Sequence, residues 1–426
     1  DAFYDELFTR AGGSGQRPEW LALIKESPMR TNSRVTVGSP TVRVATIMVA
    51  TLLLAVALAA AGAGAQQLLA SSGPIVVAQD GSGDFATLTE AVAEADDGDT
   101  VKVRPGTYVE AIVIEDDIVL EGDGELEDIV IRAPEDGPEW DTQFPWIGEK
   151  PYAIVLADSG ASVSGLTLSG EDSRLFVDGG SASVSGMLFD DVGTSPASAG
   201  TAIARALIVT GGADADVRDN DFLGGNGINV FDYSVARIED NHFDIGGIYG
   251  DYGDGTIIRN NTFSGAAPMA IRFGEPADVL VEGNEISDRE VAINTVNGMG
   301  PATIKANIIS GAAMTAISAD GSTGQVVDNV ITGSNLGISW SGEDGLVANN
   351  EVIGGATGII VGAGTSTIDG NTVSGTENRG MLVYPNAVAE LSGNSLCDNT
   401  VNLDIRDDAA VVDDGTNEIC EDAPAE

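Results

Sequence analysis

Short runs of alternating apolar and polar residues recur along the second half of the chain, and each run leads into an asparagine. Successive asparagines are 20 to 23 residues apart, and about ten residues after most of them a glycine or alanine precedes isoleucine. The ten asparagines are Asn220, Asn241, Asn261, Asn284, Asn307, Asn329, Asn350, Asn371, Asn394 and Asn417. A fixed period in this range predicts stacked supersecondary units.

The composition of the repeated units favours strands over helices. They are rich in Gly, Asn, Asp, Val and Ile and lack the Leu-x-x-Leu-x-Leu frame of leucine-rich repeats. Short strands joined by tight turns suit these residues, and one unit per coil gives a parallel β-helix. An inward asparagine at a bend can bond the backbone of its own turn and the asparagines above and below it. We therefore expect an asparagine ladder inside coils of about 22 residues.

The same frame continues toward the N-terminus. It recurs around Val163 and Val184, with Leu166 and Met187 at the asparagine position. The segment 190–216 is too long for one coil and indicates an insertion, and roughly 13 or 14 coils are expected in all. Earlier strands are predicted at Thr100–Val103, Ile112–Ile114, Ile118–Leu120 and Ile129–Ile131. The solenoid is thus expected to occupy residues 76–426, after a linker at 66–75.

Two segments before the repeats have other roles. Thr87 and Glu90 form a capping-box pattern at the start of a predicted helix, Leu88–Ala95, whose apolar stripe suits a cap on the stack. Residues 44–65 are uncharged and apolar, and three arginines precede them. They predict either a membrane-spanning helix, with 1–43 as a cytoplasmic or non-native segment, or the core of a signal peptide that begins at Met29. Both alternatives place the solenoid outside the cytoplasm.

The two cysteines support that location. Cys397 and Cys420 each stand three residues after a ladder asparagine, so the repeat places them in one column on adjacent coils. Equivalent positions on adjacent coils are close enough for a disulfide. A bridge predicts an extracytoplasmic compartment. The alternative is a pair of buried thiols.

The charge of the chain excludes several partners. There are 66 acidic and 20 basic residues, for a net charge of −46. Such a surface repels nucleic acid and anionic lipid, so membrane contact is expected through residues 44–64 only. It also disfavours a polyuronate unless cations bridge the two. No cofactor is expected, although clusters such as Asp96-Asp97 and Asp413-Asp414 suit a loosely bound cation such as Ca²⁺; no EF-hand or zinc-ligand spacing is present, and no metal site is predicted.

The opening of the solenoid resembles a known family. The segments Val77–Phe85, Thr89–Val92 and Gly106–Glu110 are similar to the opening of pectin methylesterases. From Val76 onward the chain resembles the pectin-lyase-like superfamily of right-handed parallel β-helices. The resemblance implies an all-β, right-handed, single-stranded parallel β-helix with an N-terminal capping helix, preceded by one apolar helix.

The catalytic motifs of that superfamily are not intact. Asp221-Phe222 resembles the nucleophile stretch of pectin methylesterases, but the repeat frame already explains both residues. Thr142-Gln143 is similar to their oxyanion glutamines, and Asp190-Asp191 to the paired acids of polygalacturonases, without the other family elements. The remaining catalytic candidates are Asp221, Arg272 and Asp251.

Ligands of such solenoids lie along an outward sheet face, and one column is rich in aromatic and amide side chains. Counting from each Gly/Ala-Ile step predicts a ligand-binding face that can stack on sugar rings and bond their hydroxyls. Its residues are Asn229, Tyr249, Arg272 and Asn294, flanked by Phe231, Tyr233, Asp251, Tyr252 and Glu275. The alternative for Arg272 is simple surface pairing with those carboxylates.

Two other features have competing interpretations. His242, the only histidine, stands in another outward column, where an inert surface role competes with metal binding or acid/base chemistry. The loop with Trp140 and Trp146 is either a binding loop or a cover for apolar surface. Together these features predict a cell-surface scaffold that binds carbohydrate or another envelope ligand. A divergent polysaccharide lyase or pectinesterase-like enzyme and a purely structural solenoid are the alternatives.

Overall fold

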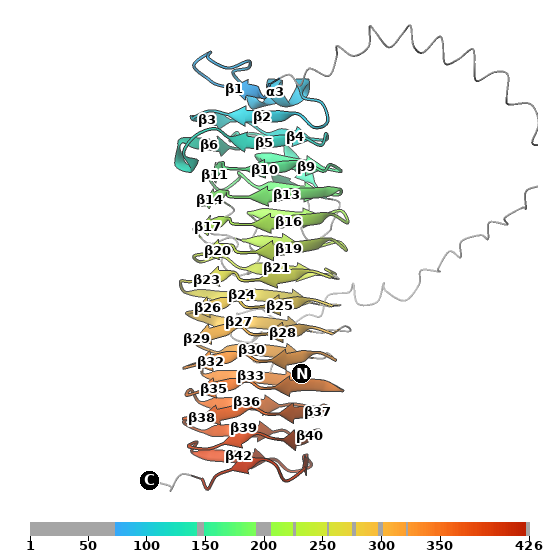
Figure 1. Cartoon of the computed structure of the whole chain (residues 1–426), viewed down its shortest axis with the longest axis vertical. Coiled ribbons are helices and arrows are strands. Elements are labelled where there is room, and N and C mark those ends of the chain that lie inside the picture. Colours follow the sequence, from blue (N-terminus) through green and yellow to red (C-terminus); the bar gives the residue numbers. More distant parts are fainter. Residues whose placement is uncertain are drawn as a thin grey trace, which may run out of the picture. The chain divides into compact units, whose positions relative to one another are not determined.

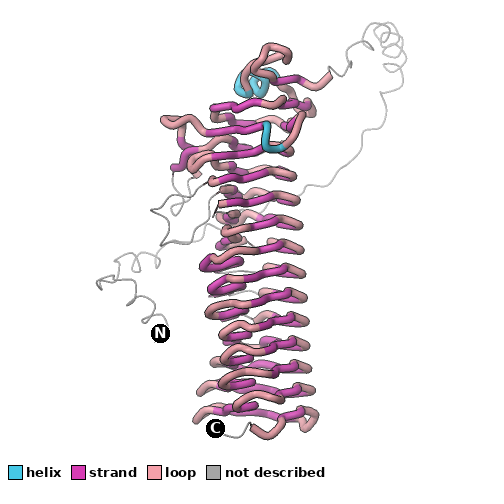
Figure 2. The backbone as a smooth tube through the Cα atoms, turned by 90° about the vertical axis from the view of Figure 1, so that its left-hand side faces the viewer, coloured by secondary structure: helices cyan, strands magenta, loops and turns pink. Residues whose placement is uncertain are grey.

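Each sequence repeat folds into one coil of three short strands, and equivalent strands of successive coils pair in parallel (Figures 1 and 2). The computed structural model describes residues 73–142, 149–192, 206–224, 227–253, 255–274, 278–296, 301–320 and 323–422. They lie in one compact unit, Ser72–Glu426. The stack has about 14 coils, as the repeat predicted.

The strands form three long parallel sheets, here called A, B and C in the order in which a coil meets them. Sheet A contains β1 (Ile75–Val77), β2 (Thr100–Val103), β5 (Val119–Gly122), β10 (Ser162–Ser164), β13 (Ser181–Ser185), β16 (Asp214–Arg218), β19 (Val235–Glu239), β22 (Ile257–Arg259), β25 (Leu280–Glu282), β28 (Thr303–Lys305), β31 (Gln325–Val327), β34 (Gly345–Ala348), β37 (Gly364–Asp369), β40 (Ala387–Ser392) and β43 (Ala410–Asp413).

Sheet B contains β3 (Gly106–Val109), β6 (Ile129–Arg132), β11 (Thr167–Ser169), β14 (Leu188–Asp190), β17 (Asp221–Leu223), β20 (His242–Phe243), β23 (Thr262–Phe263), β26 (Glu285–Ser287), β29 (Ile308–Ser310), β32 (Val330–Thr332), β35 (Glu351–Ile353), β38 (Thr372–Ser374), β41 (Ser395–Leu396) and β44 (Glu418–Ile419).

Sheet C contains β4 (Ile112–Ile114), β9 (Ile154–Ala157), β12 (Leu175–Asp178), β15 (Leu207–Thr210), β18 (Ile228–Val230), β21 (Ile248–Asp251), β24 (Ala267–Gly274), β27 (Arg289–Val296), β30 (Thr315–Asp320), β33 (Leu336–Ser341), β36 (Thr357–Val361), β39 (Arg379–Val383) and β42 (Val401–Ile405). A two-stranded antiparallel hairpin, β7 (Glu139–Asp141) and β8 (Glu149–Pro151), stands apart from the three sheets.

The asparagine ladder lies at the bend between sheets A and B. Asn284 shows the pattern: its Nδ2 donates to the carbonyl of Ile258 at 3.1 Å and to Oδ1 of Asn307 at 2.9 Å. Its own Oδ1 accepts from the backbone N–H of Asn261 at 2.9 Å. Asn284 therefore satisfies buried polar groups of the preceding coil and is itself bonded to the asparagine of the next coil. Leu166 and Met187 occupy the same position in earlier coils, and the N–H of Met187 is bonded to Asn220.

The residue before most ladder asparagines has a left-handed backbone, which explains its identity. Asp219, Asp240 and Asn260 have φ between 55° and 57°, and glycine takes the place at Gly283 and Gly370. Asp, Asn and Gly tolerate this conformation better than other residues do. The Asp/Asn/Gly-Asn pair of the repeat is therefore a turn requirement.

The interior is filled by the inward residues of all three sheets. On sheet B, the rings of Phe189, Phe222, Phe243 and Phe263 stack nearly parallel, with centroids 4.5 to 4.7 Å apart. All four rings are buried. The stack fixes the register of sheet B, because a slip of one residue would turn each ring to solvent.

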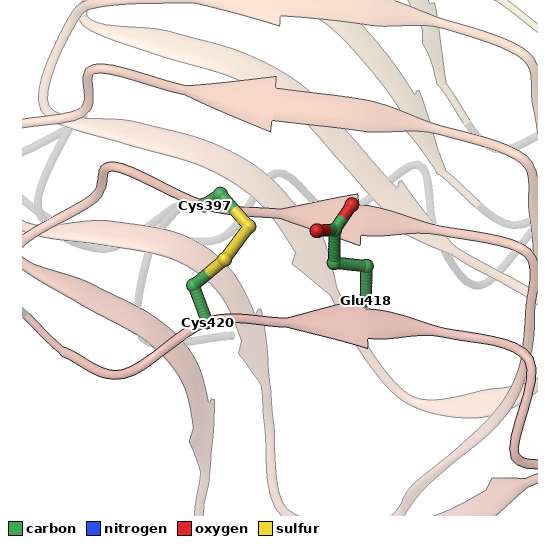
Figure 3. A group of neighbouring side chains, drawn as sticks. All are labelled: Cys397, Glu418 and Cys420. Carbon is green, nitrogen blue, oxygen red and sulfur yellow. A yellow bond between two sulfur atoms is a disulfide. The ribbon is translucent and has the colours of Figure 1, made fainter.

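The two ends of the stack are closed differently. Helix α3 (Leu88–Glu94) covers the first coils with Leu88 and Ala91, and the Thr87 side chain accepts the N–H of Glu90 at 3.2 Å. The helix ends one residue before the predicted end. At the other end, Cys397 and Cys420 form the predicted disulfide, with Cα atoms 4.9 Å apart (Figure 3).

The insertion expected within 190–216 enlarges one coil of sheet C. The paired residues Leu175 and Leu207 are farther apart in the sequence than the next pair, Leu207 and Ile228. The extra residues lie between β14 and β15. The apolar segment 44–65 lies outside the described residues. Within the described ranges, no helix is long and apolar enough to cross a membrane.

Candidate functional site

The strands of sheet C pair in the predicted register, but two residues of the predicted outward column are closed to solvent. Asn229 pairs with Tyr249, Tyr249 with Arg272, and Arg272 with Asn294. However, Asn229 is 0% exposed and Tyr249 only 7%, so neither offers a sugar-stacking surface. Burial raises the pKa of Tyr249 to about 12. The expectation of an open binding face at these two residues was wrong.

A second apolar cluster lies on the outer side of sheet C, on the coils that precede Asn229 and Tyr249. Val155, Phe176 and Ile208 follow one another in the same outward column and are fully buried. Phe231, which was expected to be a ligand contact, packs with them. The next coils have polar residues at the outward positions of sheet C. The coils of Val155, Phe176 and Ile208 do not, because their outward residues form an apolar core of their own.

The tryptophan loop contributes to that cluster. Trp140, on the β7–β8 hairpin, packs edge-to-face against Tyr152 with ring centroids 6.2 Å apart. It therefore covers apolar surface, which was one of the two interpretations of this loop. Trp146 lies outside the described residues.

A pocket of about 590 Å³ opens beside this hairpin, at the turns that follow the sheet C strands. Five carboxylates line it, together with Trp140, and none of the described lining residues is a lysine or arginine. Its residues are Glu115, Trp140, Asp141, Thr142, Ala157, Asp158, Asp178, Gly211 and Asp232. We call this the acidic pocket. The pocket was not predicted from the sequence, because its carboxylates come from separate coils and from the hairpin.

Asp178 is held in the acidic pocket by a hydrogen bond from the hairpin. The indole Nε1 of Trp140 donates to its Oδ2 at 2.7 Å. A Cβ atom at Gly211, on the next coil, would collide with the Asp178 carboxylate, so glycine there allows the carboxylate to keep this position. Burial raises the pKa of Asp178, and the nearby carboxylates of Asp158, Asp232 and Asp141 add to the rise.

Two tyrosines continue the site along the solenoid. Tyr233 follows Asp232 of the acidic pocket, and Tyr252 occupies the equivalent turn of the next coil, with ring centroids 5.6 Å apart. Tyr233 is 72% exposed and Tyr252 37%. Both have left-handed backbones, with φ of 57° and 59°, which is rare for a bulky side chain and stores strain. We call these two residues the tyrosine pair.

The residues singled out for catalysis do not form one site. Asp221 lies on sheet B, whereas Asp251 and Arg272 lie on sheet C. Asp251 places its carboxylate over Gly274, and the half-buried Arg272 lies on the same strand as that glycine. Glu275, their expected companion, lies outside the described residues.

The single histidine is held by neighbours on the face of sheet B. His242 Nδ1 lies 3.3 Å from Asp221 Oδ1, and its Nε2 lies 3.2 Å from Ser264 Oγ. The structure therefore brings the predicted nucleophile and the histidine together as a surface pair. They lie on strands of sheet B, away from the turns that form the acidic pocket.

A buried arginine was missed from the sequence. Arg289 is 1% exposed, and its guanidinium donates to the carbonyls of Ile245, Asp244 and Ser264 at 2.9 to 3.0 Å. Burial lowers its pKa to about 10. It satisfies backbone oxygens at the corner between sheets B and C, so its role is structural.

Comparisons with known proteins agree with this architecture. Residues 205–335 match the family model described as a right-handed β-helix region, and residues 277–417 match that of the periplasmic copper-binding protein NosD. The chain is a right-handed parallel β-helix protein. A search of curated proteins found no match.

Solved structures share the fold of this β-helix protein at low sequence identity. One is the catalytic unit of a thermostable GH87 α-1,3-glucanase from Streptomyces thermodiastaticus, with 18% identity, a TM-score of 0.56, and coverage of 76% of this chain and 69% of that one. Another is a GH87 α-1,3-glucanase catalytic domain in complex with nigerose, with 11% identity, a TM-score of 0.51, and coverage of 81% and 68%. At these identities the likeness shows the fold alone.

Among the described residues, no cluster of histidine, cysteine and carboxylate side chains fits a copper site of the kind that the NosD name implies. Copper favours thiolate, thioether and imidazole ligands. Among the described residues, the one cluster of three potential ligands is Cys397, Glu418 and Cys420, and its two sulfurs are bonded to each other (Figure 3). The histidine is engaged with Asp221 and Ser264. In one of the acidic turns expected to hold a loose cation, Asp413 accepts the backbone N–H of Gly415.

Proposed function

We propose that this β-helix protein acts outside the cytoplasm and binds an extended glycan across the acidic pocket and the tyrosine pair. The observation that carries the proposal is the adjacency of these two features. Asp232 lines the pocket, and Tyr233, the next residue, begins an exposed aromatic surface that continues to Tyr252 on the following coil.

The chemistry of the site suits a sugar chain. Aromatic rings stack on the apolar C–H faces of pyranoses, and carboxylates accept hydrogen bonds from hydroxyls. Coils are separated by about 4.8 Å, the interstrand spacing, so a chain running along the stack meets equivalent turns at regular steps. The strained backbone of Tyr233 and Tyr252 supports a functional role, because such strain concentrates at binding sites.

Two observations support the extracytoplasmic location. The Cys397–Cys420 disulfide requires an oxidising compartment. The NosD model that matches residues 277–417 is described as periplasmic. The GH87 neighbours are named as glucanases, and they add only that this fold can present a glycan site.

A glycan array with fluorescently labelled residues 72–426, the unit with its own core, tests the proposal. We expect retention of at least one oligosaccharide class, and loss of that retention on the double change Tyr233→Ala and Tyr252→Ala. Tyr384→Ala is the matched control, because Tyr384 is an exposed tyrosine that follows a sheet C strand several coils away. The proposal would be refuted if the protein retained no glycan, or if Tyr384→Ala reduced retention as much as the double change does.

Glycan cleavage at the same site is a second candidate, favoured by Asp178. A carboxyl whose pKa is raised among other carboxylates can act as a general acid, and glycoside hydrolysis uses two acids in different protonation states. Release of reducing ends from a retained glycan, abolished by Asp178→Asn while retention persists, would support cleavage. Retention with intact glycan after prolonged incubation would leave binding as the function.

A further inference from the structure

The acidic pocket has an unusual charge balance for a glycan site. Its described lining residues include five acidic and no basic side chains, and the pocket belongs to a chain of net charge −46. Asp178, half-buried within it, receives a hydrogen bond from Trp140 and stands beside three other carboxylates. A neutral sugar would leave this repulsion in place, and an anionic sugar would increase it.

The carboxylates of the pocket are too widely spread to chelate one metal ion. A calcium ion needs six to eight oxygens at about 2.3–2.6 Å, so its carboxylate ligands must converge. Among the described residues, no three pocket carboxylates bring oxygens within 4.8 Å of one another. Their spread suits several separate positive or hydrogen-bonding groups on one elongated ligand.

Unpartnered polar groups beside the pocket also point to a ligand. Thr210 pairs with Asp178 on the adjacent strand and lies between Asp178 and Phe231 on the outward face of sheet C. The next residue in the chain, Gly211, lines the pocket. Thr210 is 0% exposed, and its Oγ1 has no hydrogen-bond partner. On the next coil, Asn229 is equally buried, and neither its Oδ1 nor its Nδ2 has a partner. Neither residue lines the pocket itself, but Thr210 lies beside Asp178. An unpaired buried polar atom is unfavourable, so a water or ligand group that gained access to Thr210 Oγ1 would be favoured.

We infer that the acidic pocket selects sugars that carry free amino groups, so that the preferred ligand is a cationic amino-sugar oligomer. This inference rests on the proposed glycan-binding function and names its ligand class. An ammonium group on a pyranose pairs with the carboxylates, while the ring stacks on Trp140 or on the tyrosine pair. Cation–π attraction to the aromatic rings and the negative field of the protein act in the same direction.

Isothermal titration of residues 72–426 with two oligomers of equal length tests the inference. One is a fully deacetylated glucosamine oligomer, and the other is its N-acetylated counterpart, which has the same rings but no charge. At pH 6 and low salt we expect the deacetylated oligomer to bind more than about tenfold more tightly, since a charge-assisted contact contributes about 1.5–3 kcal/mol. Raising the salt should weaken it and leave the acetylated oligomer nearly unchanged.

A charge-matched pair of variants separates the pocket from the general field. Asp178→Asn with Asp232→Asn removes two charges inside the pocket, and Asn retains an acceptor for Trp140 and tolerates the left-handed backbone of Asp232. Asp328→Asn with Asp344→Asn removes two exposed charges from distant turns. We expect the first variant to lose more than about tenfold in affinity for the deacetylated oligomer and the second less than about twofold.

Each other outcome has a definite meaning. Equal binding of the two oligomers, or equal losses in the two double variants, overturns the inference and leaves glycan binding intact. Binding of CaCl₂ alone that is removed by the pocket variant overturns it in favour of a metal site. If neither oligomer binds but the array retains a neutral glycan, the amino-sugar inference fails alone; if no glycan binds at all, both proposals fail.

Discussion

Replacing one asparagine in the middle of the ladder should destabilise the solenoid strongly. Asn284→Ala removes the acceptor of the buried Asn261 N–H, at 2.9 Å, and the donor to the Ile258 carbonyl, at 3.1 Å. It also removes the side-chain link to Asn307, at 2.9 Å, although the backbone N–H of residue 284 still donates to Asn307 Oδ1. The loss therefore concentrates on the bend of the coil above.

The magnitude follows from these bonds. A buried N–H without an acceptor costs about 1–3 kcal/mol, and each further neutral hydrogen bond contributes about 0.5–1.5 kcal/mol. We expect Asn284→Ala to lower the free energy of unfolding by about 2–5 kcal/mol. Asn335→Ala is the control, because Asn335 is exposed, and it should stay within about 0.5 kcal/mol of the parent.

Urea unfolding of residues 72–426, followed by far-UV circular dichroism, measures the change in stability. Repeat arrays can unfold in parts, so native-state amide hydrogen exchange should accompany it. The N–H of Asn261 should lose protection by a factor that matches the local loss, while amides several coils away keep theirs. An Asn284→Ala protein that unfolds with the parent and retains protection at Asn261 would refute the ladder as a source of stability.

Three further changes follow from the structure. Replacing Cys397 and Cys420 together by serine should cost about 3 kcal/mol and expose chiefly the last coil to hydrogen exchange, because the bridge closes a loop of 23 residues; unchanged protection there would contradict this. Phe222→Ala, in the middle of the phenyl stack, should cost about 3–5 kcal/mol in urea unfolding, whereas Leu223→Ala, partly exposed on the same strand, should cost little. Asp178→Asn should raise the melting temperature at pH 7. The pKa of Asp178 in the folded state is raised above 3.8. Between pH 3.8 and that raised pKa the folded state binds more protons than the unfolded state, so the protein loses stability as the pH rises through this range. Below pH 3.8 the difference between variant and parent should vanish, and a variant less stable at pH 7 would contradict the reasoning.

The regular parts of the molecule could be predicted because each position repeats under the same physical constraint. A ladder asparagine must satisfy a bend, and the residue before it must accept a left-handed backbone, so both identities recur. The register that follows from them placed Cys397 beside Cys420 and Tyr249 beside Arg272, and the structure shows both. The period of the sequence was therefore enough to predict the fold, the ladder and the disulfide.

Exposure could not be predicted in the same way. Asn229 and Tyr249 occupy outward positions, yet both are buried, and outward apolar residues such as Phe176 form a second core on earlier coils. Alternation within a strand says which side of the sheet a residue faces, but not what lies over that side. The acidic pocket was missed for a related reason, since it combines turns of several coils with a hairpin outside the repeat.

The departures from the repeat are concentrated on one stretch of the solenoid. The β7–β8 hairpin, the enlarged coil before β15 and the tyrosine pair all fall between residues 139 and 252, and the acidic pocket lies among them. Beyond β27 the regular ladder continues, and the outward column of sheet C passes through Ser318 and Ser339. A stack that only needed to be stable would have no reason to hold Tyr233 and Tyr252 in strained turns or to gather five carboxylates around one tryptophan. The regular coils therefore supply length and rigidity, and the irregular ones are where a ligand should be sought.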